Sequence, residues 1–151
     1  MLDFPPKKDF IFGSVKKHWG VLHGYNPKKI TYSWGFYTSH STGFFIKRSS
    51  AKKVGLYNIK YKYHADYDYF YRMIVKHKLK GIGTKKNELF GIFARGGFSS
   101  KINFFDHLVE CTKIRLDNGQ NKISGFDSGK QGGGVRRRVP NKPNTGGAEI
   151  T

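Results

Sequence analysis

The residues whose types and spacing could carry out a reaction lie in the segment HADYDYFYRM, residues 64–73. Its two aspartates, Asp66 and Asp68, form a D-x-D pair in a chain with 28 Lys and Arg residues against 10 Asp and Glu residues. Such a pair can hold a divalent cation against a diphosphate, because carboxylate oxygens suit hard cations. One carboxylate can instead act as a general base that accepts the proton of a hydroxyl group.

The same aspartates also have a purely structural interpretation. Apolar residues recur here at helical spacing: Tyr67, Phe70, Tyr71 and Ile74. This pattern predicts a helix that begins at Asp66, with Asp66 as its cap and Asp68 in its first turn, where negative charge is favoured. Asp68 and Arg72 lie four residues apart, so we expect them to pair. Local pattern leaves the structural and the chemical interpretations both open.

No other catalytic pattern competes with this segment. The sequence shows no phosphate-binding loop, no H-E-x-x-H pattern and no Ser/His/Asp order, and its 6 histidines are scattered. We therefore expect most histidines to lie on the surface. The single cysteine, Cys111, excludes an internal disulfide, fits a reducing compartment and argues against zinc bound by cysteines. No metal ligands are predicted.

The net charge of +18 favours association with polyanions such as nucleic acid, anionic lipid or phosphorylated substrates. A solvated, lysine-rich surface explains the same charge. The sequence has no apolar run long enough to cross a membrane, and its first residues lack the apolar region of a signal peptide. We expect a cytoplasmic protein that can lie peripherally at a membrane.

Strands and helices alternate around the aspartate segment. Five stretches have the composition of short strands or buried apolar runs: FIFGSV at 10–15, KITYSW at 29–34, GFFIKR at 43–48, LKGIGT at 79–84 and NELFGIFA at 87–94. A short helix is expected next to the third stretch, capped by Ser49 or Ser50 and ended by Gly55. This mixture predicts an α/β or α+β layered fold.

A second long helix is predicted after Ser99 and Ser100, with its end at the DNG sequence of 117–119. Its apolar face is expected to hold five residues: Ile102, Phe105, Leu108, Val109 and Leu116. Residues 124–151 are rich in Gly, Pro, Asn and Ser without periodicity, so we expect a flexible, disordered tail after a folded domain at 1–123.

The order of motifs resembles the second half of family 2 glycosyltransferases of the GT-A fold. That order is F-[IV]-[KR]-[KR], a short helix, G-x-[FY], and x-D-Y-D opening a helix that carries Arg. The chain has FIKR at 45–48, GLY at 55–57, ADYD at 65–68 and Arg72, and ARGGFSS at 94–100 resembles a later GG-[VIF]-S element. The similarity runs from about Ile11 to Ile123.

The resemblance implies a partial GT-A fold, a short mixed sheet with flanking helices. It implies transfer of a sugar from a nucleotide-sugar donor to a hydroxyl of a glycan or lipid-linked acceptor, with inversion. Asp66 matches the catalytic base, and Asp68 matches a position on the acceptor side. His40, in TSHST, matches a segment near the donor's diphosphate and the acceptor. Arg95, in RGG, is a candidate for meeting phosphate charge, and a surface position explains it equally well.

The chain also departs from the family pattern. The donor-binding half and its metal-binding D-x-D do not precede Ile11, although the resemblance implies a divalent cation, Mg²⁺ or Mn²⁺. We therefore expect an incomplete catalytic domain that acts with a donor-binding chain or is inactive alone. The alternative function is a non-catalytic basic module that binds nucleic acid or an anionic membrane surface.

Overall fold

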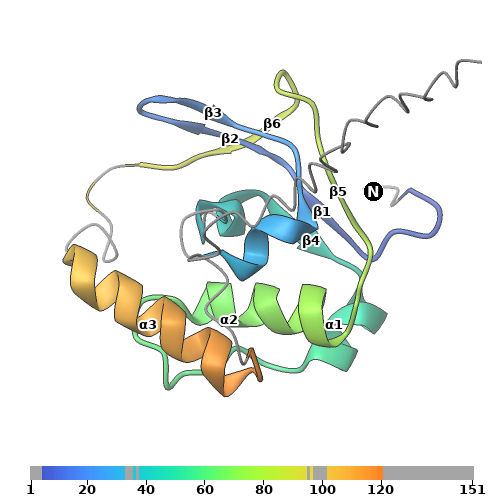
Figure 1. Ribbon diagram of the computed structural model, residues 1–151. Coiled ribbons are helices and arrows are strands. Elements are labelled where there is room, and N and C mark those ends of the chain that lie inside the picture. The colour runs from blue at the N-terminus through green and yellow to red at the C-terminus, as the bar shows by residue number, and fades with distance from the viewer. Residues whose placement is uncertain (1–4, 33–35, 37, 95, 97–101, 121–151) are drawn as a thin grey trace, which may run out of the picture.

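The computed structural model describes residues 5–32, 36, 38–94, 96 and 102–120 of the chain. Within them the fold is α/β: two small mixed sheets lie on one side of the molecule and three α-helices on the other (Figure 1). The predicted α/β class is therefore confirmed, while the tail expected at 124–151 falls outside the described residues. No helix in the described ranges combines the length and apolar character needed to cross a bilayer.

Each sheet is built around one half of the predicted 10–15 strand. The first sheet has the order β4 (Phe44–Ile46), β1 (Phe10–Phe12), β5 (Gly81–Gly83), and the second has the order β3 (Gly20–Leu22), β2 (Ser14–Lys17), β6 (Leu89–Ile92). In both sheets the central strand pairs antiparallel with one neighbour and parallel with the other. The stretches predicted as strands at 43–48, 79–84 and 87–94 are thus confirmed.

The core forms where β1 meets the helices. All three residues of β1 are buried, and the Phe12 ring meets the Phe70 ring of α2 edge-on at 5.1 Å between centroids. On the neighbouring strand, a Cβ at Gly81 would stand only 2.0 Å from the Phe10 ring. A residue without a side chain is therefore required there for Phe10 to pack across the sheet.

The helices follow in the order α1 (Arg48–Val54), α2 (Ala65–Tyr71) and α3 (Phe104–Asp117), and α2 continues as a π-helical turn over Arg72–Lys76. Two 3₁₀ helices, η1 (Pro27–Thr31) and η2 (Thr38–Gly43), lie between the strands β3 and β4. α2 packs against α3, and both 3₁₀ helices contact α2. α2 is thereby surrounded by elements from distant parts of the sequence.

Two local predictions before α2 were wrong. The strand predicted at 29–34 is replaced by η1, because Asn26 accepts a hydrogen bond from the Lys28 amide and Pro27 opens the turn. α1 begins at Arg48 without a side-chain cap, and the hydroxyl of Ser50 donates to Asp9 instead. Its predicted end is confirmed, since Gly55 follows the last turn with a φ of 84°.

The predicted apolar face of α3 was also wrong. Phe105 and Val109, expected in the core, are 75% and 63% exposed, whereas Cys111 and Ile114 are buried. The helix therefore presents the other of its two apolar stripes to α2. Its predicted end is confirmed: α3 stops at Asp117, and Gly119 has a φ of 86°.

The observed orientation of α3 predicts which of its apolar residues stabilises the fold. Ile114→Ala should lower the free energy of unfolding by about 2–5 kcal/mol, because it leaves a cavity in the core. Phe105→Ala should change it by less than about 0.5 kcal/mol, because the ring is exposed. Urea unfolding followed by circular dichroism measures both, and the reverse ranking would support the orientation predicted from the sequence.

Candidate active site

The start of α2 holds Asp66 differently from the predicted cap. α2 begins at Ala65, one residue earlier than expected, and its N-cap residue His64 makes no side-chain capping bond. Asp66 lies in the first turn, where its Oδ1 accepts a 2.8 Å hydrogen bond from the adjacent Tyr67 amide. Its side chain is half-buried. One oxygen of the carboxyl therefore has a defined partner, and the side chain is only partly exposed.

Burial raises the pKa of Asp66 from its ordinary 3.8 to about 6. The bond from the Tyr67 amide opposes the rise most strongly, followed by nearby His64 and the Ser41 side chain. Ser41 belongs to η2, so the pKa of this carboxyl is set jointly by η2 and the start of α2. A carboxyl with a pKa near neutrality both releases and accepts a proton readily at cellular pH.

Asp68 has a structural position. It is 1% exposed, its Oδ2 accepts from Arg72 Nε at 2.9 Å, and its Oδ1 accepts from Asn118 Nδ2 at 2.8 Å. The predicted pair with Arg72 is confirmed. Arg72 donates further to the carbonyls of Val54 and Leu56, at 2.6 Å and 2.8 Å. Both oxygens of Asp68 thus hold α2 to α3 and, through Arg72, to the turn after α1.

A chain of hydrogen bonds connects α3 to the residue before α2. Glu110 accepts from the amides of Lys62 and Tyr63, at 2.7 Å and 3.0 Å, and its Oε2 lies 2.8 Å from His64 Nδ1. The other ring nitrogen of His64, Nε2, lies 2.7 Å from Nδ1 of His107. Both ring nitrogens of His64 therefore have partners on α3, Glu110 at Nδ1 and His107 at Nε2.

Cys111 completes this cluster. One ligand atom from each of His64, His107 and Cys111 lies within 4.8 Å of the others. Burial raises the pKa of the Cys111 thiol to about 12, and burial together with His64 lowers the pKa of His107. Three of the six histidines, His18, His23 and His77, are exposed as expected, whereas His40 and His64 are buried. The sequence did carry one signal of this cluster, the four-residue spacing of His107 and Cys111 on one predicted helix.

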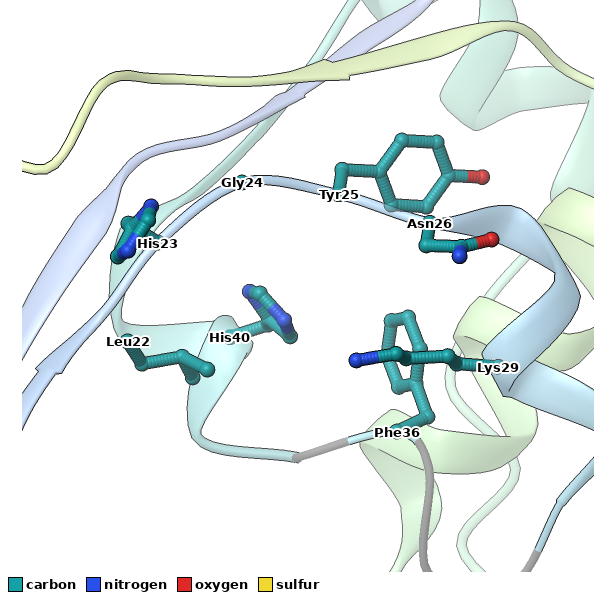
Figure 2. A pocket seen from close by; sticks show the side chains of 8 residues that line it. All are labelled: Leu22, His23, Gly24, Tyr25, Asn26, Lys29, Phe36 and His40. Atoms are coloured by element: carbon teal, nitrogen blue, oxygen red, sulfur yellow. The ribbon is translucent and has the colours of Figure 1, made fainter.

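His40 lines a pocket of about 210 Å³ that is shown in Figure 2. Eight residues form its wall: Leu22, His23, Gly24, Tyr25, Asn26, Lys29, Phe36 and His40. His40 is 7% exposed, and its Nδ1 is a buried nitrogen without a hydrogen-bond partner within the described part of the chain. Burial, reinforced by Lys17 and Lys29, lowers the pKa of His40 to about 4, so the ring is neutral at pH 7.

The predicted site residues are therefore brought together only in part. His40 lines the pocket, and the next residue along η2, Ser41, acts on the Asp66 carboxyl. Asp68 is close to Asp66 in sequence but is committed to Arg72 and Asn118. Arg95 lies outside the described residues.

Comparison with known proteins gives no relative from which a function could be transferred. The chain matches no protein-family model, no curated protein and no solved structure.

The contrast between the two aspartates predicts that the same substitution lowers stability at one position and hardly changes it at the other. Asp68→Asn should lower the free energy of unfolding by about 3 kcal/mol, because it leaves the partly buried Arg72 guanidinium without its charged partner. Asp66→Asn should leave it nearly unchanged, because an amide oxygen still accepts from the Tyr67 amide. Urea denaturation at pH 7 measures both. Equal losses for the two variants would contradict the assignment of separate roles.

Proposed function

We propose that the chain is the acceptor-side part of an inverting glycosyltransferase in which Asp66 is the general base. The observation that carries the proposal is the difference between neighbouring carboxyls. Both oxygens of the buried Asp68 are used by Arg72 and Asn118, whereas Asp66 is half-buried and interacts with the Tyr67 amide and the Ser41 side chain. The motif order of residues 40–73 supports the same role.

The reaction needs one proton acceptor. The acceptor's hydroxyl oxygen attacks the anomeric carbon of the donor sugar, the bond from that carbon to the diphosphate breaks, and the hydroxyl proton moves to the Asp66 carboxylate. The base must reach the hydroxyl within hydrogen-bond distance and works best with a pKa near the working pH. The raised pKa of Asp66, about 6, meets the second condition.

The His40 pocket is the part of this site suited to the departing diphosphate. Lys29 supplies a positive charge, and Asn26 and the neutral His40 ring supply polar groups. In Figure 2 the Lys29 side chain extends toward His40 across the pocket. At about 210 Å³ the pocket is smaller than the roughly 300–1,000 Å³ of sites that enclose a drug-sized ligand, so it takes only part of a nucleotide sugar. The nucleoside is left to a donor-binding unit.

The Mg²⁺ or Mn²⁺ ion that the resemblance implies does not fit the described residues. A D-x-D cation site needs carboxylate oxygens that are free to coordinate. The D-x-D pair at 66–68 fails this condition, because Asp68 is 1% exposed and bonded through both oxygens. Charge on the departing diphosphate is therefore assigned to Lys29.

The alternative of a basic binding module rests on the net charge of +18. Filter binding of DNA and RNA over a salt series separates it from the enzymatic role, since binding through phosphates weakens steeply with salt. Retention at low salt that Asp66→Asn leaves unchanged, together with no sugar transfer, would favour the module. Flotation with anionic vesicles makes the same distinction for a membrane surface.

The base assignment predicts a loss of catalysis without a loss of fold. Asp66→Asn should lower the rate of sugar transfer by at least about 10²-fold, because the amide cannot accept the hydroxyl proton. The rate is followed as nucleoside diphosphate released from a panel of nucleotide sugars with saccharide acceptors, with and without a donor-binding partner chain. Asp106→Asn, which alters an exposed carboxylate at the start of α3, is the matched control. Full activity in the Asp66 variant would remove the base role.

The pocket assignment predicts that two neighbouring lysines differ. Lys29→Gln should weaken binding of a nucleoside diphosphate by about tenfold, because it removes a charged partner from the pocket. Lys28→Gln should leave the affinity within about twofold, because Lys28 does not line the pocket. Isothermal titration calorimetry at fixed ionic strength measures both. Equal losses would show that the phosphates respond to overall charge and not to this pocket.

A further inference from the structure

The cluster of His64, His107 and Cys111 lies beside the start of α2 and has no part in the proposed base role of Asp66. His64, His107 and Cys111 come from two elements and bring one ligand atom each to within 4.8 Å of the others. Two imidazole nitrogens and a thiol are the donor types found in zinc sites. Two of the three side chains are buried, and His107 is half-buried, so the atoms converge below the surface.

The geometry points to a zinc site formed by His64 Nε2, His107 Nδ1 and Cys111 Sγ, with water in the fourth position. Zinc holds nitrogen at about 2.0–2.1 Å and sulfur at about 2.3 Å in a tetrahedron, so neighbouring ligand atoms stand roughly 3.3–3.8 Å apart. The two histidine nitrogens are 2.7 Å apart, and all three ligand atoms lie within 4.8 Å. Small side-chain rotations therefore convert the hydrogen-bonded arrangement into a coordinating one.

The outer contacts of the cluster are those of a metal site. Glu110 Oε2 accepts from His64 Nδ1 at 2.8 Å, which directs the lone pair of Nε2 toward His107. A carboxylate that orients a metal-binding histidine in this way is a recurring feature of zinc sites. Glu110 is itself fixed by the amides of Lys62 and Tyr63. The orientation of the first ligand is therefore set before any metal binds.

The charge around the cluster suits a divalent cation. Binding of that cation releases one proton from an imidazole ring and one from the thiol. His107 gives up its Nδ1 proton, Cys111 its thiol proton, and both pass to solvent. Glu110, whose Oε2 lies 2.8 Å from His64 Nδ1, places negative charge beside the cluster. The mixed nitrogen and sulfur donors select zinc over magnesium or calcium.

Bound zinc would connect the residue before α2 with the buried face of α3. His64 is the N-cap residue of α2 and stands two positions before Asp66, whereas His107 and Cys111 lie one turn apart on α3. Metal occupancy would therefore strengthen the α2–α3 contact at the end of α2 that carries Asp66. This inference stands independently of the proposed sugar transfer.

Cobalt substitution is the decisive test, because Co²⁺ reports its ligands by absorption. The full-length chain is produced without a histidine tag, reduced without added thiols, and titrated with Co²⁺ and then with Zn²⁺. We expect one Co²⁺ per chain, the intense visible bands of tetrahedral cobalt, a sulfur-to-cobalt charge-transfer band, and displacement of all of these by Zn²⁺. A spectrum of octahedral cobalt without the charge-transfer band would overturn the site.

Variants assign the ligands. Cys111→Ser should remove the charge-transfer band, and His107→Gln should weaken Zn²⁺ binding by at least about a hundredfold. Glu110→Gln should weaken it by about 10–100-fold through the orientation of His64. His77→Gln alters an exposed histidine outside the cluster and should change nothing. Circular dichroism checks that each variant folds.

Two results would overturn the zinc site whatever the fate of a single variant. One is wild-type chain that binds Zn²⁺ no more tightly than the Cys111→Ser and His107→Gln variants do. The other is binding that His77→Gln abolishes. In either case the cluster would be a hydrogen-bonded contact between helices and not a metal site. Sugar transfer is measured separately, so its absence would leave the metal result unaffected.

Discussion

The carboxylate of Glu110 is the contact on which the rest of the site depends. It accepts hydrogen bonds from the amides of Lys62 and Tyr63 and lies 2.8 Å from a ring nitrogen of His64, so one side chain of α3 fixes the three residues that precede α2. The Lys62 amide is exposed, whereas the Tyr63 amide is partly buried and would be costly to leave unpaired. Glu110 therefore holds the segment that leads into α2 against α3, next to Asp66.

A second attachment explains why neighbouring aspartates have different roles. Asp68 is held by Arg72 and Asn118, so its charge is neutralised inside the fold and is not free for a ligand. Asp66, two residues earlier, lies on a different side of α2, where burial is partial and its pKa rises to about 6. The contacts of Asp68 hold this part of α2 in place and do not involve the Asp66 carboxyl. This division leaves Asp66 available for the base role that we propose.

Some local signals in the sequence were predictive, whereas contacts between distant residues were not predicted. The Asp68–Arg72 pair and the end of α1 at Gly55 depend on residues within one turn of each other, and both were predicted correctly. The face of α3 was not, because Phe105 and Ile114 lie on two apolar stripes, and only packing against α2 decides between them. The meeting of His64 with α3 joins residues 43 positions apart, a separation at which helix periodicity carries no information.

The claim that Asp66 faces an acceptor site is tested most directly by nuclear magnetic resonance of the isotopically labelled chain during titration with oligosaccharides. We expect the backbone amides of Tyr67, which donates to the Asp66 carboxyl, and of Ser41 to shift with a common saturation curve, and Asp66→Asn to abolish the shifts. An unchanged spectrum, or shifts that avoid both amides, would contradict the claim.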